Sequence, residues 1–504
     1  MPASSSLSDA TSSTDSDFAS PPSLDLLVLT FNCAKTLINT PIFAHHVQTA
    51  LSQNASGLPD LVVLSLQELA PLSYCFIGGY FLNPYLARFQ DAFNLAVKNY
   101  LVDHPVAHRS EPHDSAVSLS QSVRPPKSPY TLVRANNVGY TAILLFARDP
   151  ARLHGIQEAE VGFGAADMGN KGAVGLRMLY QSAKGPSTEL TFVSTHLAAM
   201  EWNLPRRNAN WAAIMRGMAF ENPEAVVTNF RKSSNPSTPE EELGETDNLL
   251  YDEHHAEQLR LQQQLHNISV FRPSSHLFVS GDLNYRISTT SPPPTAIFPS
   301  LDPESANYYP DFFRRDQLTR ERKAGRTLHG LEEHPVHFPP TYKYDVLPPK
   351  SPEAIETEVP WRFAPHRYPS WTDRILFLDV PSWVKGKAGG YSQKPAMKVR
   401  AYDALPLLRT SDHRPVFLRV DVPLIEPGDL APPAGIVDAS GVRDPRVRLP
   451  MEIDPEAWER RAAARRKEVM AGWSMFLWST KQGAWILTTL LAISISVYWL
   501  SRGF

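Results

Sequence analysis

Several acidic and amide side chains directly follow apolar runs, and their types suit a hard metal ion. They are Asn32 after LLVLTF, Glu68 after VVLSLQ, Asp282 and Asn284 in SGDLN, and Asp412 in SDH. Each one taken singly is better explained as a capping or surface residue, because Asp and Asn favour turns through local hydrogen bonds. Their joint placement predicts one oxygen-rich site, since Mg²⁺ needs only one or two carboxylates when a substrate phosphate completes its shell.

Two histidines stand beside apolar runs of the same kind, His196 in STHLAA and His413 in SDHRPVF. A lone histidine in such a place is ordinarily a hydrogen-bonded core residue. A neutral histidine held by a carboxylate can act as a base, and a protonated one can stabilise phosphate charge. A set of histidine, carboxylate and metal therefore indicates hydrolysis of a phosphate ester.

Basic side chains occur in the same polar segments. They are Lys171 in GNKGAV, Arg206 and Arg207 in PRRN, Lys343 in PPTYKYD, Arg367 ahead of PSWTDRI, and Arg414. Any single one is most simply a solvated surface residue. A small ring that carries several phosphates would need such a cluster, because charge-assisted hydrogen bonds from Lys and Arg are the strong ones.

The elements that must position these residues are short, β-branched apolar runs typical of buried strands. The runs are residues 24–31, 61–66, 140–146, 190–194, 276–279, 375–378 and 416–420. Stretches rich in Ser, Pro and charge interrupt them and predict surface insertions at 104–129, 232–248, 289–303 and 347–360. Strands that end in polar residues predict a layered α/β enzyme with one catalytic domain at 23–423.

The composition excludes several classes of protein. The chain has 504 residues, of which 42% are hydrophobic and 20% charged, so it is neither mostly disordered nor collagen-like. Its 49 basic and 52 acidic residues give a net charge of -3, which argues against a nucleic-acid-wrapping protein. Cys33 and Cys75 have no metal-site spacing around them, which predicts neither a disulfide framework nor a zinc site.

The two ends of the chain differ in character. Residues 1–22 predict a disordered tail without a secretory signal, which favours the reducing cytosol. Residues 483–501 carry no charge, lie between Lys481 and Arg502, and have Trp485, Tyr498 and Trp499 near their ends. They predict a membrane-spanning tail anchor, the alternative being a buried core helix.

Two further segments separate the catalytic domain from this anchor. Residues 424–453 predict a Pro-rich linker, and residues 454–482 a basic juxtamembrane segment. Within the latter, WERRAAARRK at 458–467 predicts a short helix for an anionic leaflet or a solvated linker helix.

Eight blocks of sequence resemble the inositol polyphosphate 5-phosphatase family in order and wording. They are TFN (30–32), LQE (66–68), GNKGAV (169–174), THLAA with RRN (195–208), SGDLNYRI (280–287), PPTYKYD (339–345), PSWTDRIL (369–376) and SDHRPV (411–416). The match covers nearly all of 23–423 and, with the apolar segment, the chain is similar to a tail-anchored fungal-type member. The resemblance implies the α+β, four-layer fold of the endonuclease/exonuclease/phosphatase superfamily: two packed, mainly antiparallel β-sheets flanked by helices, with the site at one end.

The resemblance also implies a Mg²⁺-dependent phosphatase and roles for residues. Glu68 would bind the metal with Asn32 and Asn284 beside it, and Asp412 would complete the metal environment. Asp282 would orient or activate water for direct in-line attack.

In the same family pattern, His196 would contact the 5-phosphate, and Asp373 would pair with His413 to fix its tautomer. The neighbouring 4-phosphate would be gripped by Lys171, Arg207, Tyr342, Lys343 and Arg367. No Cys-x5-Arg loop is present for a thiolate nucleophile, which agrees with direct attack.

Two departures from the family pattern stand out. Ala34 replaces a second polar residue after TFN, and Asn210 with Trp211 replaces an acidic-aromatic pair after RRN. Neither position belongs to the groups assigned to chemistry, so an active enzyme is expected.

The anchor bears on the substrate. Tethering near lipid headgroups favours phosphatidylinositol 4,5-bisphosphate, converted to the 4-phosphate, and the short apolar span suits the thinner endoplasmic reticulum bilayer. One alternative is a phosphodiesterase of the same superfamily, a nuclease or sphingomyelinase, although a nuclease has no use for Lys171 and Lys343 together. The other is a non-catalytic, anchored phosphoinositide-binding protein.

Overall fold

The computed structural model describes residues 21–105, 128–183, 185–234, 247–349, 357, 359–385, 394–437 and 443–503. Most of the predicted tail (1–22) and of the predicted insertions at 104–129, 232–248 and 347–360 lie outside these ranges. The remaining predicted insertion, 289–303, is a largely exposed loop without helix or strand.

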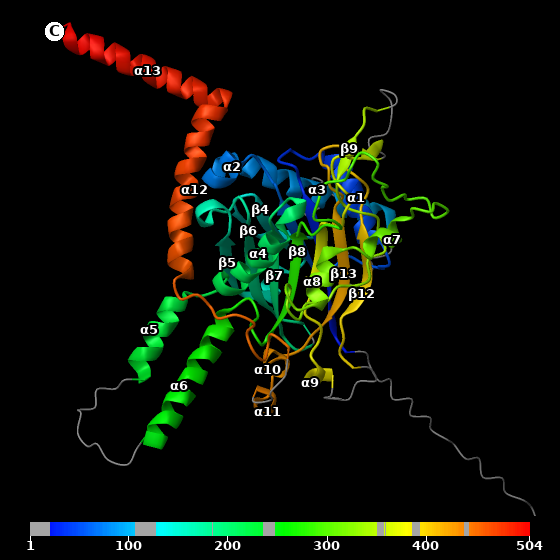
Figure 1. Cartoon of the computed structure of the whole chain (residues 1–504), viewed down its shortest axis with the longest axis vertical. Helices are drawn as coiled ribbons and strands as arrows, with labels where there is room; N and C mark the ends of the chain where they lie inside the picture. The colour runs from blue at the N-terminus through cyan, green and yellow to red at the C-terminus, as the bar shows by residue number, and fades with distance from the viewer. Residues whose placement is uncertain are drawn as a thin grey trace, which may run out of the picture.

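Two sheets form the centre of the molecule (Figure 1). The first has the strand order β12 (Lys398–Ala404), β13 (Val416–Pro423), β1 (Ser23–Asn32), β2 (Leu61–Gln67), β4 (Thr141–Ala147) and β3 (Thr131–Val138). The second has the order β11 (Asp373–Phe377), β8 (Ser275–Asp282), β7 (Thr188–His196), β6 (Gly172–Tyr180) and β5 (Leu153–Gly162). Only the pairs β1–β2 and β7–β8 are parallel in these two sheets.

The layers follow from which strand faces are apolar. Leu26 and Val28 of β1 pack with Phe192 of β7 and Phe278 of β8, so the two sheets share one core. The opposite face of β1 packs against helices α1 (Thr40–Ser52) and α3 (Asn83–Asp103), and the outer face of the second sheet packs against α4 (Leu204–Gly217). The predicted four-layer α+β sandwich is confirmed.

The remaining elements are short or peripheral. A small sheet pairs β9 (Tyr344–Val346) with β10 (Trp361–Phe363). The other helices are α2 (Leu72–Ile77), α5 (Pro223–Ser234), α6 (Asp247–Ile268), α7 (Tyr309–Phe313), α8 (Gln317–Lys323), α9 (Ser382–Lys385), α10 (Pro427–Leu430), α11 (Ala434–Val437), α12 (Ala457–Ser479) and α13 (Lys481–Arg502).

The first strand of the described chain pairs with the last. β1 and β13 are antiparallel, with Ser23 opposite Pro423 and Thr30 opposite Val416. A buried salt bridge supports this pairing, because Arg419 Nε lies 2.6 Å from Asp25 Oδ1. The central strand β1 is therefore completed by a segment almost 400 residues further along the chain.

The segment after β13, predicted as a linker (424–453) and a basic juxtamembrane segment (454–482), packs in part against the domain. Arg446, in the predicted linker, is buried and donates to the carbonyl of Asp379 at 2.6 Å. Further on, α12 is a single 23-residue helix that lies along the domain (Figure 1), with Arg461 buried beside Glu468. The basic residues at 458–467 therefore belong to a helix that packs against the domain. Some of them form ion pairs with carboxylates of the same helix or of the domain.

Helix α13 begins at a capped N-terminus, where the Thr480 hydroxyl accepts from the backbone N–H of Gly483 at 2.9 Å. It projects away from the domain (Figure 1), and its apolar side chains are exposed, as in Trp485 (74%) and Leu491 (62%). Among the described residues it is the one helix long and apolar enough to cross a membrane, judged by length and composition. The alternative of a buried core helix does not describe it.

Candidate active site

The predicted chemical residues meet at one end of the sandwich because strand ends meet there. In the second sheet His196, the last residue of β7, is opposite Asp282, the last residue of β8. On the other side of β8, Asp282 is opposite Asp373, the first residue of β11. Asn32 ends β1 in the first sheet and donates through Nδ2 to Asp282 Oδ2 at 3.0 Å. Asp282 is therefore the residue at which both sheets converge.

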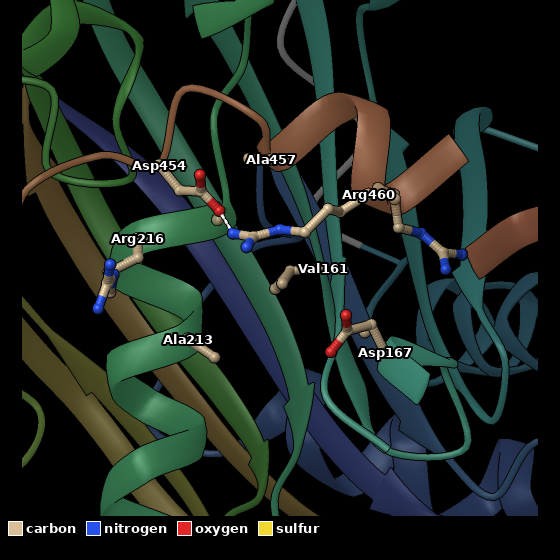
Figure 2. A pocket seen from close by; sticks show the side chains of 10 residues that line it. Val161, Asp167, Ala213, Arg216, Asp454, Ala457 and Arg460 are labelled. Atoms are coloured by element: carbon tan, nitrogen blue, oxygen red, sulfur yellow. Dashed lines mark ion pairs between the residues drawn. The ribbon is translucent and has the colours of Figure 1, made fainter. Parts of the chain in front are cut away.

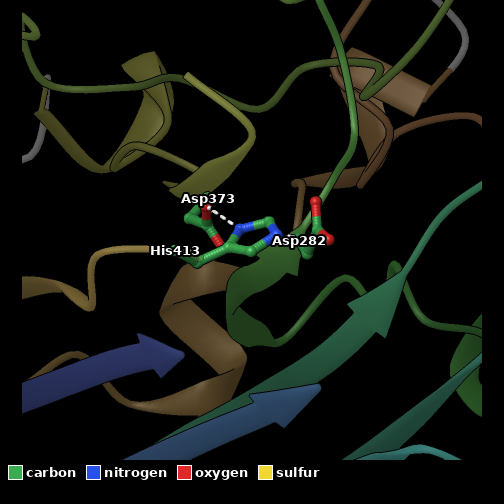
Figure 3. Close-up of side chains that lie close together, drawn as sticks. All are labelled: Asp282, Asp373 and His413. Carbon is green, nitrogen blue, oxygen red and sulfur yellow. Dashed lines mark hydrogen bonds and ion pairs between the residues drawn. The ribbon is translucent and has the colours of Figure 1, made fainter. Parts of the chain in front are cut away.

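A histidine–carboxylate pair stands next to Asp282 (Figure 3). His413 Nδ1 lies 2.9 Å from Asp373 Oδ2, and the hydroxyls of Thr341 and Thr372 donate to the same oxygen at 2.7 and 2.8 Å. The other ring nitrogen, His413 Nε2, points to Asp282 Oδ2 at 4.0 Å. The predicted pairing of Asp373 with His413 is thus present in the geometry, and it directs Nε2 toward the centre of the site.

The proton on His413 is strongly held. Burial alone would lower the pKa of its imidazole, but the carboxylates of Asp373, Asp282 and Asp412 outweigh burial and raise that pKa to about 10. The groups around Asp282 shift its pKa in the opposite direction. Burial would raise the pKa of its carboxyl, yet His196, His413 and Lys171 bring it well below the usual range. At neutral pH and without metal, an imidazolium therefore faces a carboxylate.

Asp282 is held on several sides. Its Oδ2 lies 3.2 Å from His196 Nε2, and its Oδ1 accepts from the backbone N–H of Asn284 at 3.1 Å. Burial and the adjacent Lys171 lower the pKa of His196, so this ring is neutral at pH 7. Lys171 Nζ contacts His196 Nε2, and burial lowers the pKa of Lys171 to about 8. The centre thus combines a carboxylate with two histidines of different charge.

The predicted metal ligand Glu68 lies at the end of β2 in a left-handed backbone conformation, with φ of 47°. Its Oε2 forms a salt bridge with Lys35 Nζ at 2.8 Å. Although burial raises the pKa of the Glu68 carboxyl, His196, Lys35 and Lys171 lower it overall, so it stays ionised. The sequence interpretation does not include Lys35. Its position five residues after Thr30, just past TFN, is the sequence feature that could have indicated a place in the site.

The predicted substrate-binding residues divide into two groups. Tyr342 and Lys343 lie near the centre: the Tyr342 and His413 ring centroids are 4.6 Å apart, and Lys343 Nζ lies 2.5 Å from Asp412 Oδ2. Asp412, predicted as a metal ligand, therefore has a lysine partner here.

The two arginines of the predicted grip have other partners. Arg367 Nε lies 3.2 Å from Glu201 Oε1, while part of its side chain stays exposed. Arg207 is fully buried, and it donates to the carbonyl of Met200 at 2.6 Å and to Gln317 Oε1 at 2.8 Å. The geometry thus gives Arg207 a role in holding the 198–201 segment, in place of direct contact with a substrate.

Arg286 was also left without a role in the sequence interpretation. Its guanidinium donates to Asn284 Oδ1 and lies 4.2 Å from the centroid of the Tyr342 ring. Arg286 follows Asn284 by two residues within SGDLNYRI, and this position in the block is the sequence feature that points to the site.

The donors around Asp282 fit a divalent cation. Asp282, Asp373 and His413 offer ligand atoms within 4.8 Å of one another, and Asp373 Oδ1 is buried without a hydrogen-bond partner among the described residues. Glu68 and Asn32 add oxygen donors at the same end of the sandwich. Hard cations prefer oxygen ligands, and His413 Nδ1 is already committed to Asp373. The carboxylate and amide oxygens are therefore the better ligand set.

Curated proteins with similar sequences were found. The chain is 25% identical over 348 residues to inositol-1,4,5-trisphosphate 5-phosphatase 1 of Schizosaccharomyces pombe, covering 68% of this chain and 24% of that protein. It is 26% identical over 253 residues to phosphatidylinositol 3,4,5-trisphosphate 5-phosphatase 1 of Mus musculus, covering 50% of this chain and 16% of that protein. The chain thus spans a quarter or less of the length of these relatives.

Among solved structures, the chain is similar to the inositol polyphosphate 5-phosphatase domain of SPsynaptojanin in complex with inositol (1,4)-bisphosphate and calcium ion. The TM-score is 0.46 at 20% identity, and the match covers 80% of this chain and 84% of that one. The family model described as endonuclease/exonuclease/phosphatase family 2 matches residues 29–419, which include every site residue discussed above. The chain therefore belongs to the endonuclease/exonuclease/phosphatase family.

Proposed function

We propose that this protein is a Mg²⁺-dependent phosphatase that removes the 5-phosphate of phosphatidylinositol 4,5-bisphosphate and leaves the 4-phosphate. The observation that carries the proposal is the line of side chains Asp373, His413, Asp282 and His196, in which an imidazolium and a neutral imidazole flank one buried carboxylate. The names of the curated relatives, which are inositol polyphosphate and phosphoinositide 5-phosphatases, support this substrate class.

The reaction adds water to the phosphorus atom and releases inorganic phosphate and the inositol hydroxyl. Asp282 accepts a hydrogen bond from the attacking water and orients it for in-line attack. His413 directs its protonated Nε2 to a phosphoryl oxygen, because Asp373 and the two threonines fix its ring. His196, which lies on the other side of Asp282, contacts the 5-phosphate.

Mg²⁺ would be held by Glu68 and Asn32, with Asn284 and Asp412 beside it, and when bound it would neutralise negative charge on the phosphate. Lys35 and Lys343 now pair with Glu68 and Asp412. These ammonium groups keep both carboxylates ionised in the metal-free protein. With a cation on these carboxylates, both lysine side chains would be available to the substrate phosphates.

The 4-phosphate lies against Lys171, Tyr342, Lys343 and Arg367. Lys171 carries charge at neutral pH because its pKa of about 8 is still above 7. Arg367 is partly exposed and forms an ion pair with the buried Glu201, which holds its guanidinium at this rim. Arg207 supports this rim from below through its bonds to backbone carbonyls.

Helix α13 is proposed as a single membrane span that holds the catalytic domain on the cytosolic face of the endoplasmic reticulum. Its length of 22 residues gives roughly 33 Å of helix, enough for a hydrocarbon core of about 30 Å. Tethering raises the local concentration of lipid headgroups, which favours lipid over soluble inositol phosphates as substrate.

A phosphate-release assay over a phosphoinositide panel tests the proposal. The full chain in mixed micelles is expected to release phosphate from phosphatidylinositol 4,5-bisphosphate with Mg²⁺, to lose this activity in EDTA, and to regain it on addition of excess Mg²⁺. Cleavage of abasic DNA or sphingomyelin without phosphoinositide turnover would replace the proposal by a phosphodiesterase. Headgroup binding without any phosphate release would replace it by a binding protein.

A further inference from the structure

Helix α12 docks through one face that contains both charge and a small residue. Its buried positions include Arg461, Ala464, Glu468, Gly472 and Phe476, which recur every three or four residues. This spacing puts them on a single stripe of an α-helix. A buried glutamate in such a stripe needs a specific reason, because an unpaired buried carboxylate is costly.

The Glu468 carboxylate is completely buried and fully engaged. Oε1 accepts from Arg461 Nη1 at 2.6 Å and Oε2 accepts from Nη2 at 3.0 Å, a bidentate pair. Arg461 is itself tied to β5, where Glu160 Oε1 lies 3.2 Å from its Nε. Glu468 Oε1 also accepts from the backbone N–H of Gly169 at 2.7 Å. Through the Glu468 carboxylate, α12 thus accepts a hydrogen bond from the main chain of the GNKGAV segment.

The GNKGAV segment that Glu468 contacts contains Lys171. A Cβ on Gly169 would lie 2.6 Å from Val138 Cγ1 and 2.9 Å from the Gly139 nitrogen, so the backbone is packed against β3 and the turn after it. The loop is closed at its base, where the N–H of Phe163 donates to the Lys171 carbonyl at 2.9 Å. Lys171, whose ammonium group contacts His196, is two positions after Gly169, so a displacement of Gly169 is expected to move Lys171.

A second contact reaches the segment that follows Glu68. A Cβ on Gly472 would lie 2.9 Å from Phe76 Cβ and 3.2 Å from the Ile77 nitrogen, so α12 and α2 touch at backbone level. Arg465 Nη1 donates to the Phe76 carbonyl at 2.8 Å. Helix α2 begins four residues after Glu68. One helix therefore contacts two of the segments that enter the site.

The N-terminal turn of α12 is less closely packed (Figure 2). A cavity of about 330 Å³ lies under it, between Val161 of β5, Ala213 of α4 and Arg460. Arg460 spans this space to form an ion pair with Asp454. The close contacts of α12 thus lie toward α13, at Glu468 and Gly472.

We propose that Glu468 is a positioning residue of the site: through the Gly169 N–H it holds the 163–171 loop and Lys171 in place, so that α12 acts as a brace between α13 and the active site. The consequence for substrate binding rests on the function proposed above, whereas the brace itself does not. Undocking of α12 then loosens the loop without touching Asp282 or His413.

Hydrogen exchange of the full chain in detergent micelles tests the brace directly. In the wild type the Gly169 amide is expected to exchange slowly, and in Glu468→Ala roughly 10- to 100-fold faster, as for loss of a hydrogen bond to a charged group. Glu468→Gln keeps an acceptor oxygen, so it should restore slow exchange at Gly169 although Arg461 then keeps Glu160 alone of its two carboxylate partners. Glu459→Ala, on the exposed face of the same helix, should leave exchange unchanged.

Calorimetric binding of inositol 1,4,5-trisphosphate in EDTA provides the second readout. Glu468→Ala is expected to weaken binding roughly tenfold, and Glu468→Gln to restore it. Fast exchange at Gly169 in the wild type, or in Glu468→Gln if the alanine variant does not fold, would overturn the brace. Faster exchange with unchanged affinity would overturn the positioning of Lys171. A wild type that neither binds nor hydrolyses inositol phosphates would refute the proposed function while the exchange data still decide the brace.

Discussion

Asp373 contributes most among the three carboxylates that raise the pKa of His413, and its contribution can be measured. Asp373→Asn removes the group that does most to raise the pKa of His413, so that pKa should fall from about 10 toward or below the ordinary 6.5, because burial then prevails. NMR titration of the imidazole in EDTA checks this. A His413 that titrates near neutrality in the wild type would contradict the arrangement.

The same pair makes stability depend on pH. The pKa of His413 is higher in the folded chain than its ordinary value of 6.5, so its stabilisation is fully present below about pH 6.5 and is lost as the pH rises to about 10. In urea unfolding of the metal-free protein, the free energy of unfolding should therefore fall from pH 6 to pH 10 by more in the wild type than in Asp373→Asn. An equal fall in both proteins would assign the pH dependence to other groups.

Asp282 is the side chain proposed to orient the attacking water. Asp282→Asn keeps the shape and removes this anion, so kcat for phosphate release should drop roughly 10²- to 10⁴-fold. Glu304→Gln, on an exposed loop, is the matched control. A variant that retains most of its kcat while unfolding at the wild-type temperature would exclude Asp282 from the chemistry.

At the scale of residues, the sequence predicted the pairing of His413 and Asp373 through the family resemblance, and the structure has it at 2.9 Å. It could not predict which carboxylate each lysine meets. The bond of Lys35 to Glu68 joins two strand-end loops, and local spacing says nothing about how such loops fold over one another. Arg207 illustrates the same limit, since burial of an arginine is decided by its tertiary neighbours.

At the scale of elements, the close approach of β7 and β8 is the most sensitive point. A Cβ on Gly281 would lie 1.8 Å from the Thr195 carbonyl oxygen, next to the catalytic ends of both strands. Gly281→Ala should therefore lower the free energy of unfolding by about 3 kcal/mol. Gly428→Ala is the control, because its added Cβ meets nothing within 4 Å. Equal thermal midpoints for both variants would contradict the close approach.

All seven apolar runs expected to be strands coincide with strands, and nearly all of their residues are buried. The strands that were missed follow other patterns. β3 is a largely exposed edge strand, β5 is polar on its exposed face, and β6 contains glycines and the buried Arg177. Their strand state depends on neighbours in the sheet, which short-range periodicity does not encode.

At the scale of the whole molecule, α13 is the proposed membrane span. An arginine in place of Leu491 should cost roughly 2.5–3.5 kcal/mol of insertion free energy. Leu491→Arg is therefore expected to move a large part of the protein from carbonate-washed membranes to the soluble fraction, with activity on soluble headgroups intact. Ser494→Ala, one turn away, is the control. Unchanged membrane retention of Leu491→Arg would mean that another part of the chain holds the protein there.

The sequence did not predict that α12 packs against the domain, because the basic residues of this helix predicted a solvated or lipid-facing segment. One acidic residue that neutralises Arg461 lies seven residues further along the same helix, and the other lies on β5, about 300 residues away in the chain. The charge pattern within a short stretch of sequence does not reveal an ion-pair partner that is so distant in the chain. The predicted boundary at residue 454 thus divides, in the sequence, two segments that both contact the domain in the structure.

The pairing of β1 with β13 bears on biosynthesis. While the ribosome translates the intervening residues, which takes roughly 20–80 s at 5–20 residues per second, the nascent β1 has no neighbour on one side. An unpaired apolar strand edge can pair with wrong partners, so chaperones are expected to bind the nascent chain until residues 416–423 have emerged. Ribosome profiling of chaperone-bound nascent chains should show occupancy that persists to that point and then declines.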